Sequence, residues 1–251
     1  MADAADVVTL KWWRPNGIPS ATKVDGSTVT EADKAAERAA LAIVLDACPS
    51  DGFLGEEVGE RQGTSGRRWI VDGIDGTRHF AAGLPTWGTL IALEYHGVIV
   101  LGVASSPVQG RRWWAVRGEG AFTGSCSAGS SGKPIRVSTS QKFSTERIVT
   151  LPTFDELSLG RQEVIGRFAG GRPADRPWSH QLQVAEGGLD MCIWFCGDIW
   201  DHAAPSLIVE EAGGRFTDHA GGKRLNTRTA IYSNGAIHDE ALAAIRNESA
   251  G

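Results

Sequence analysis

Apolar residues recur along the chain with two periods, one typical of helices and one typical of strands. Between Thr30 and Asp46, alanine, isoleucine and valine return every three or four residues, which is the spacing of one helix face. Thr30 stands at the expected N-cap, and Asp33 follows in the position of a capping box. Further helical periods occur over residues 162–168, 181–187, 203–212 and 238–246.

Short apolar runs bounded by turn residues predict strands between these helices. The runs 89–93 and 98–101 flank His96-Gly97, a dipeptide typical of a hairpin turn, and others cover 113–116 and 148–151. The Gly- and Ser-rich stretch 122–133 favours a surface excursion near a lobe boundary. We therefore expect one layered α/β domain with two lobes, an α+β lobe over 1–140 and an α/β lobe over 141–251.

Composition and charge narrow the classes of partner. The 251 residues carry a net charge of −5 without a basic run, which argues against a nucleic acid polymer or an anionic membrane as partner. No apolar run reaches transmembrane length, and residues 1–10 lack the regions of a signal peptide. The four cysteines fit no zinc signature and favour reduced thiols, so we expect a cytoplasmic protein.

The segment 69–77, Trp-Ile-Val-Asp-Gly-Ile-Asp-Gly-Thr, carries the clearest chemical signal. An apolar strand ends at Asp72, and Asp75 follows, so both carboxylates can face one cation. Gly76 and Thr77 then open a helix whose free amides can hold a phosphate. Alone, the segment has two interpretations, a turn and a metal-and-phosphate site, and both stay open.

Acidic residues elsewhere in the chain favour the second interpretation. Glu56 lies at the end of an apolar segment, where a neighbouring strand could bring it beside Asp72. Asp201 opens a helix, where an aspartate is also typical of an N-cap. Oxygen ligands without a Cys or His set suit a hard cation such as Mg²⁺. A bound metal would also give this acidic protein the local positive charge that an anionic phosphate requires.

Taken together and in this order, these motifs resemble the inositol monophosphatase family of Mg²⁺-dependent phosphatases. The family's Gly-Glu-Glu, Trp-Ile-Val-Asp-Pro-Ile-Asp-Gly-Thr and Trp-Asp-x-Ala-Ala motifs match 55–57, 69–77 and 200–204, and Val-Thr-x-x-Asp matches 29–33. The stretches 112–115 and 184–188 look most like the histidinol-phosphate phosphatase branch. The resemblance implies the αβαβα sandwich shared by inositol monophosphatases and fructose-1,6-bisphosphatases.

The resemblance also implies a role for each matching position. The implied metal ligands are Glu56, Asp72, the carbonyl of Ile74, Asp75 and Asp201. The amides of Gly76 and Thr77 would hold phosphate, and Lys23 would lie near a weaker metal. The implied catalytic set is Glu56, Asp75, Asp33 and Thr77, of which the last two would orient the attacking water. The implied cofactor is two or three Mg²⁺ ions, replaceable by Mn²⁺ and inhibited by Li⁺ or Ca²⁺, in a homodimer.

Three positions depart from the family pattern. Gly73 replaces a proline, which predicts weaker Mg²⁺ binding and a Gly73→Pro variant that binds more tightly. Arg78 indicates either a solvated helix surface or contact with an anionic substrate. Trp194 stands where inositol-type members carry a glutamate, and an indole cannot accept hydrogen bonds from sugar hydroxyls. Trp194 either stacks on a flat ring or belongs to the core, and both interpretations stay open.

The alcohol half of the substrate is the least constrained part of the site. Candidate contacts, each of which could be exposed loop instead, are Asp175, Arg176, Trp178, His180 and Asp198. Histidinol phosphate or a related amino alcohol phosphate is our first hypothesis, with a nucleoside monophosphate or inositol 1-phosphate as alternatives. A bisphosphate fits if Arg78 or Arg172 holds a second phosphate. A remote alternative is a catalytically inactive homologue that acts as a binding module.

Overall fold

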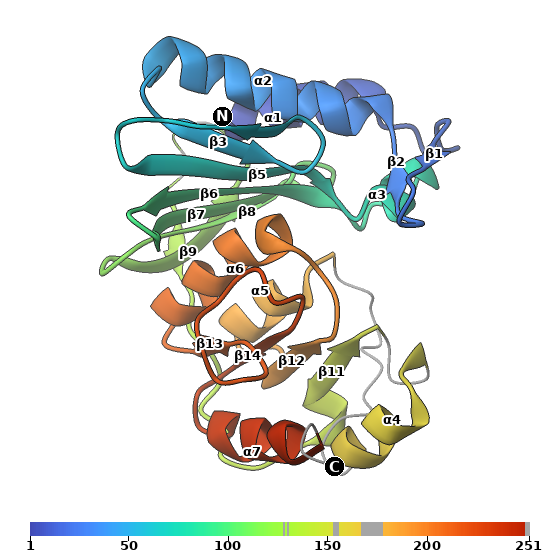
Figure 1. The fold of residues 1–251 in the computed structure, drawn as a ribbon, viewed down its shortest axis with the longest axis vertical. Helices are drawn as coiled ribbons and strands as arrows, with labels where there is room; N and C mark the ends of the chain where they lie inside the picture. The colour runs from blue at the N-terminus through green and yellow to red at the C-terminus, as the bar shows by residue number, and fades with distance from the viewer. Residues whose placement is uncertain (128, 130, 153–155, 167–177, 249–251) are drawn as a thin grey trace.

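Two β-sheets alternate with three layers of helices along the long axis of the molecule (Figure 1). From the N-terminal end, the layers are α1 and α2, an eight-stranded sheet, α5 and α6, a four-stranded sheet, and α4 with α7. The computed structural model describes all residues except 128, 130, 153–155, 167–177 and 249–251. The αβαβα sandwich expected from the sequence is confirmed.

The eight-stranded sheet holds most of the first half of the chain. Its order is β10-β9-β8-β7-β6-β5-β3-β4; β3 and β5 are parallel, and the other neighbours are antiparallel. Its strands are β3 (Gly52–Gly55), β4 (Gly59–Arg61), β5 (Arg67–Asp75), β6 (Gly88–Tyr95), β7 (Val98–Ser106), β8 (Arg111–Val116), β9 (Gly120–Ser125) and β10 (Lys133–Pro134). The other elements of this half are α1 (Ala2–Trp12), the hairpin of β1 (Ala21–Thr22) and β2 (Thr28–Val29), α2 (Glu31–Ala47) and α3 (Thr77–Ala81).

The four-stranded sheet belongs to the second half and has the order β11-β12-β14-β13. Its strands are β11 (Ile148–Leu151), β12 (Met191–Trp194), β13 (Arg215–Thr217) and β14 (Ala230–Ser233). The helices of this half are η1 (Thr145–Arg147), α4 (Leu159–Ile165), α5 (His180–Ala185), α6 (Ile199–Glu211) and α7 (His238–Glu248). The two sheets therefore take their strands from opposite sides of residue 140.

Helix α6 is the centre of the main core. Its buried residues Leu207 and Ile208 pack in one cluster with Leu90 of the large sheet and Tyr232 of the small sheet. Burying apolar surface on both sides of one helix joins the two halves through a shared hydrophobic contact. This arrangement also fixes where the first turn of α6 lies relative to the large sheet.

The strongest local signals in the sequence are confirmed. Thr30 Oγ1 accepts a hydrogen bond from the Ala32 amide, and Asp33 Oδ2 accepts one from the Thr30 amide, so the capping box begins α2. His96 and Gly97 both have positive φ, 46° and 81°, the requirement of a tight primed hairpin turn.

One expectation about the first half needs correction, and one helix was not predicted. The stretch 122–133 is not wholly a surface excursion, because strand β9 runs to Ser125 and the Phe122 ring stacks on Trp114, with centroids 6.1 Å apart. Glycines and serines in that stretch masked the strand pattern. Helix α1 has no counterpart in the sequence prediction, because its apolar periodicity is weak and Val7 and Leu10 are exposed. Among the described helices, none has the length and apolar character that crossing a bilayer requires.

Candidate metal and phosphate site

A break in the pairing of β5 brings its two aspartates to one place. Side chains three positions apart on a regular strand point to opposite faces. Between Asp72 and Asp75 the register with β6 shifts, and Asp72 Oδ1 accepts a hydrogen bond from the Ile74 amide at 2.9 Å. The irregularity therefore allows both carboxylates to reach the same cluster.

The first turn of α6 supplies the third carboxylate. Asp201 Oδ2 accepts a hydrogen bond from the Asp198 amide at 2.5 Å, so Asp201 lies inside the helix and is not its N-cap. One carboxylate oxygen from each of Asp72, Asp75 and Asp201 lies within 4.8 Å of the other two. The structure thus brings together three of the predicted metal ligands from two distant segments.

The electrostatics of this cluster indicate that it needs a cation. Burial, followed by repulsion from neighbouring carboxylates, raises the pKa of Asp72 and of Asp201 well above the ordinary value. Burial raises the pKa of Asp75 to about 7, although a hydrogen bond from Trp178 opposes this rise. An all-oxygen donor set of mutually repelling carboxylates fits a divalent hard cation such as Mg²⁺.

Glu56 faces a lysine beside this cluster. Lys23, in the loop between β1 and β2, pairs with Glu56 Oε1 at 2.6 Å and also with Glu57. Burial raises the pKa of Glu56, and its charge in turn raises the pKa values of Asp72, Asp75 and Asp201. The predicted residues Lys23 and Glu56 are therefore neighbours of the cluster, and the ammonium group partly neutralises the acidic site.

Asp33 and Thr77, to which the resemblance assigns the attacking water, lie next to each other. Thr77 Oγ1 lies 2.8 Å from Asp33 Oδ1 and 2.9 Å from the Ile74 carbonyl oxygen, and its one proton can be donated to either acceptor. Burial raises the pKa of Asp33 even though Thr30 and Thr77 donate hydrogen bonds to it. Gly76, at φ 85°, directs the chain from β5 into α3, which begins at Thr77.

The predicted substrate contacts lie in different surroundings. Trp194 is buried in β12, its ring lies edge-on to His202, and its Nε1 donates to Cys192 Sγ, so the structure places it in the core. Asp198 pairs with Arg228 at 3.1 Å, and Arg78 is exposed on α3. The predicted contacts Arg172, Asp175 and Arg176 lie outside the described residues.

The segment after residue 177 contributes an aromatic side chain to the site. Trp178 Nε1 donates a hydrogen bond to Asp75 Oδ2 at 2.6 Å. Its ring lies 6.1 Å from that of Trp113, and it fills space that a Cβ on Gly88 would occupy. His180 begins α5, and burial lowers its pKa to about 4, so its imidazole is neutral at pH 7. None of the described hydrogen bonds joins His180 to the carboxylates.

Glu37 is a buried acidic residue that belongs to none of the sequence motifs. It lies one helical turn after Asp33 on α2, and burial raises its pKa to about 7. A sequence signal existed, because Glu37 interrupts the apolar stripe that runs through Ala36 and Ala40. A charged residue at such a buried position indicates a specific partner.

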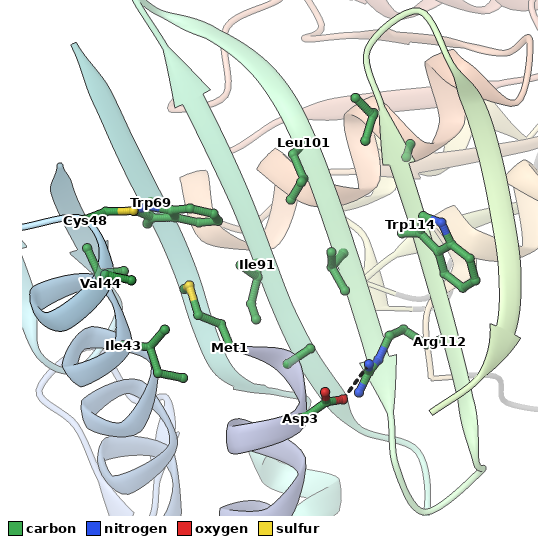
Figure 2. Close-up of a pocket in the computed structure, with 15 residues that line it drawn as sticks. Met1, Asp3, Ile43, Val44, Cys48, Trp69, Ile91, Leu101, Arg112 and Trp114 are labelled. Atoms are coloured by element: carbon green, nitrogen blue, oxygen red, sulfur yellow. Dashed lines mark ion pairs between the residues drawn. The ribbon is translucent and has the colours of Figure 1, made fainter. Parts of the chain in front are cut away.

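A cavity of about 480 Å³ lies between α1, α2 and the large sheet, as Figure 2 shows. Its walls are mainly apolar and include Ile43, Trp69 and Leu101. Of the residues that line it, Arg112 is paired with Asp3 at 2.7 Å. The cavity borders the sheet face opposite α6 and lacks the carboxylate cluster, so it is not the metal site.

Fold and carboxylate cluster together define the class of metal-dependent phosphate-ester hydrolases, and comparison with known proteins agrees. The inositol monophosphatase family model matches residues 2–250. A Streptomyces coelicolor histidinol-phosphatase is 38% identical, over 96% of this chain and 92% of that protein. A Mycobacterium tuberculosis histidinol-phosphatase is 37% identical, over 96% of this chain and 94% of that protein. The crystal structure of the extragenic suppressor protein SuhB from Bartonella henselae superimposes with a TM-score of 0.83 at 30% identity, covering 98% of this chain and 95% of that one.

The chain therefore belongs to the inositol monophosphatase family. It is a phosphoric monoester hydrolase of a Mg²⁺-dependent family.

Proposed function

We propose that this chain hydrolyses histidinol phosphate, or a related amino alcohol phosphate, at the site formed by Asp72, Asp75 and Asp201. The observation that carries the proposal is the meeting of these three carboxylates within 4.8 Å at the end of β5. The choice of ester is supported by two relatives named histidinol-phosphatase, at 38% and 37% identity over nearly the whole chain.

Each residue of the proposed site has a chemical task. Asp72, Asp75 and Asp201, with Glu56 and the Ile74 carbonyl, hold Mg²⁺, which supplies charge neutralisation and Lewis acidity when bound. Amides of Gly76 and Thr77 hold phosphate oxygens, since backbone N–H groups bind anions without steric hindrance.

Asp33 and Thr77 form the part of the site that acts on water. When Thr77 Oγ1 donates its proton in a hydrogen bond to Asp33 Oδ1, 2.8 Å away, its lone pairs are free to accept a hydrogen bond from an attacking water. Asp33 thereby fixes the orientation of the hydroxyl, and the water is held in line with phosphorus. Phosphoryl transfer asks mainly for such positioning and charge stabilisation.

Inositol 1-phosphate is the second candidate substrate. A Rhizobium meliloti relative named inositol-1-monophosphatase is 35% identical over 82% of this chain. Against this candidate, the position of the sugar-binding glutamate in inositol-type members holds Trp194, whose buried indole offers no carboxylate to hydroxyl groups.

The proposal also includes properties that come from the family resemblance. These are two or three Mg²⁺ ions at saturation, replacement by Mn²⁺, inhibition by Li⁺ and Ca²⁺, a homodimer and a cytoplasmic location. Lys23 pairs with Glu56 and Glu57 in the described conformation, and we place it at the edge of the metal site.

A panel of phosphate esters tests the proposed function. Phosphate release is measured for histidinol phosphate, inositol 1-phosphate, a nucleoside monophosphate and a generic aryl phosphate across a Mg²⁺ titration. The expected result is Mg²⁺-dependent release with the highest kcat/KM for histidinol phosphate. Equal or higher kcat/KM for another ester would overturn the substrate assignment, and no release from any ester would favour a binding module.

A further inference from the structure

The Glu37 carboxylate is buried beneath the turn that follows β3. Its side chain has no exposed surface, and Oε2 accepts hydrogen bonds from the amides of Glu57 and Val58, each at 2.9 Å. The other oxygen, Oε1, is buried without a hydrogen-bond partner. Leaving such an oxygen unpaired costs free energy, so packing alone does not account for an acid at this position.

Two glycines leave the space that the Glu37 side chain occupies. A Cβ on Gly55 would overlap the Glu37 carboxylate, and a Cβ on Gly73 would lie 3.1 Å from Glu37 Cγ. Gly55 directly precedes Glu56, and Gly73 directly follows Asp72. Since β3 and β5 are parallel neighbours, Glu37 lies where both strands lead into predicted metal ligands.

We propose that Glu37 is a positioning residue that fixes the turn after β3 against the end of β5, so that Glu56 and Asp72 face one divalent cation. Glu37 acts through the amides of Glu57 and Val58 and does not itself bind the metal. This inference rests on the metal site of the proposed function. Residues that orient metal ligands from behind typically account for about 10–100-fold in metal affinity.

Two substitutions at Glu37 separate positioning from packing. Glu37→Leu replaces the side chain with an apolar one of similar size. It removes the carboxylate acceptor and leaves the amides of Glu57 and Val58 unpaired. Glu37→Gln keeps one acceptor oxygen, which can still receive both N–H groups. Mg²⁺ binding to the full chain is measured by calorimetry without substrate, at a temperature where each variant is folded.

The expected result is a Kd for Mg²⁺ that rises at least about tenfold in Glu37→Leu and stays within about threefold of the wild type in Glu37→Gln. Wild-type Mg²⁺ affinity in folded Glu37→Leu would overturn the proposal. Equal losses in both variants would overturn it too, since the acceptor oxygen would then not carry the effect.

Two further variants complete the test. Gly55→Ala displaces the Glu37 carboxylate without removing it, and we expect a rise in the Kd for Mg²⁺ comparable to that of Glu37→Leu. If Glu37→Leu does not fold, Gly55→Ala alone tests the positioning role. Asp190→Leu is the matched control, because Asp190 is a buried acid whose side-chain partners, Arg147 and Ser138, belong to none of α2, β3 and β5. It should lower Tm and leave Mg²⁺ affinity unchanged.

Failure of the proposed function has a different signature. The calorimetric titration contains no phosphate ester, so a wild-type protein that binds Mg²⁺ but hydrolyses no ester counts against the proposed function alone. Normal hydrolysis together with unchanged Mg²⁺ binding in Glu37→Leu and Gly55→Ala counts against the positioning role alone.

Discussion

Trp178 Nε1 and Asp75 Oδ2 are 2.6 Å apart, so an indole N–H is donated to a carboxylate that we assign to the metal. The contact joins residues 103 positions apart in the sequence. The hydrogen bond lowers the pKa of Asp75, opposing the larger effect of burial. Trp178 therefore favours the ionised form of Asp75, which is the form that binds a cation.

Trp178→Phe should weaken Mg²⁺ binding most strongly at low pH. Phenylalanine keeps an aromatic ring but has no N–H, so the pKa of Asp75 should rise above about 7 and protons should compete better with the metal. We expect the Mg²⁺ concentration for half-maximal activity to rise more at pH 6 than at pH 8.5. The measurement is a Mg²⁺ titration of activity at both pH values.

Trp69→Phe is the control for that experiment. Trp69 Nε1 donates to Asp51 Oδ2 at 3.1 Å, which is a comparable indole–carboxylate bond away from the cluster. This variant should leave the Mg²⁺ dependence unchanged at both pH values. The same Mg²⁺ dependence in Trp178→Phe and wild type would contradict the role assigned to Trp178.

Gly73→Pro should weaken Mg²⁺ binding, the opposite of the expectation drawn from the family pattern. A Cβ at Gly73 would lie 2.7 Å from the Asp33 carbonyl oxygen, so α2 would have to move away from β5. Proline would also remove the backbone N–H of Gly73, whose dipole near the Glu37 carboxylate lowers the pKa of Glu37 without forming a hydrogen bond to Oε1. Calorimetry should give a Kd raised by about tenfold, as for other changes behind the ligands.

Gly52→Ala provides the comparison, because Gly52 lies at the far end of β3 and its Cβ would meet backbone atoms at 3.2 Å. We expect it to change Mg²⁺ affinity by less than about threefold. Tighter Mg²⁺ binding in Gly73→Pro would restore the simpler interpretation, in which proline only restrains the loop.

The sequence predicted the clustered carboxylates better than the residues that support them. Asp72, Asp75 and Asp201 belong to motifs in which the chemistry demands a residue type at a fixed spacing. Glu37 and Trp178 act through contacts between distant segments, so the sequence indicates Glu37 only as an acid in an apolar stripe and Trp178 only as a candidate substrate contact, without their partners. The motifs therefore predicted the carboxylates that the structure brings together, but not the hydrogen bonds that orient them.

The same limit explains the two errors in the fold. Strand β9 was masked because Gly120 and Gly124 lower strand propensity, whereas its pairing with β8 is a tertiary contact. Helix α1 was missed because Asp6 is buried through a pairing with Arg112, which lies far along the chain. Trp194 was ambiguous for a similar reason, since burial in β12 depends on α6 packing over it.

Asp72→Asn should abolish turnover and stabilise the metal-free protein. The substitution removes a ligand charge, and loss of such a residue should lower kcat by at least about a thousandfold. It also removes one of three mutually repelling carboxylates, so Tm in the presence of a chelator should rise. Phosphate release and thermal unfolding are measured on the same preparation.

Asp46→Asn, on the exposed side of α2, is the matched control. It should change neither the rate of phosphate release nor the Tm. Full activity of Asp72→Asn would refute the metal assignment. A fall in Tm without metal would show instead that the negative charge of Asp72, which strengthens the hydrogen bond from the Ile74 amide, stabilises the apo fold.

Stability of the metal-free protein should fall as pH rises, and Mg²⁺ should cancel the effect. The pKa values of Asp72 and Asp201 in the folded state are raised well above the ordinary Asp value, and that of Asp75 is raised to about 7. The folded state therefore binds more protons than the unfolded chain between about pH 4, the unfolded value, and the raised folded values. In that window, each carboxylate contributes stability at the acid end that is lost as it ionises, since the ionised groups repel.

With chelator, Tm should decline from pH 5.5 to pH 8; with saturating Mg²⁺, the decline should disappear. The Asp72→Asn variant should show a shallower decline in chelator. A chelated wild type whose Tm rises over this range would mean that the three carboxylates do not dominate the pH dependence of the apo protein.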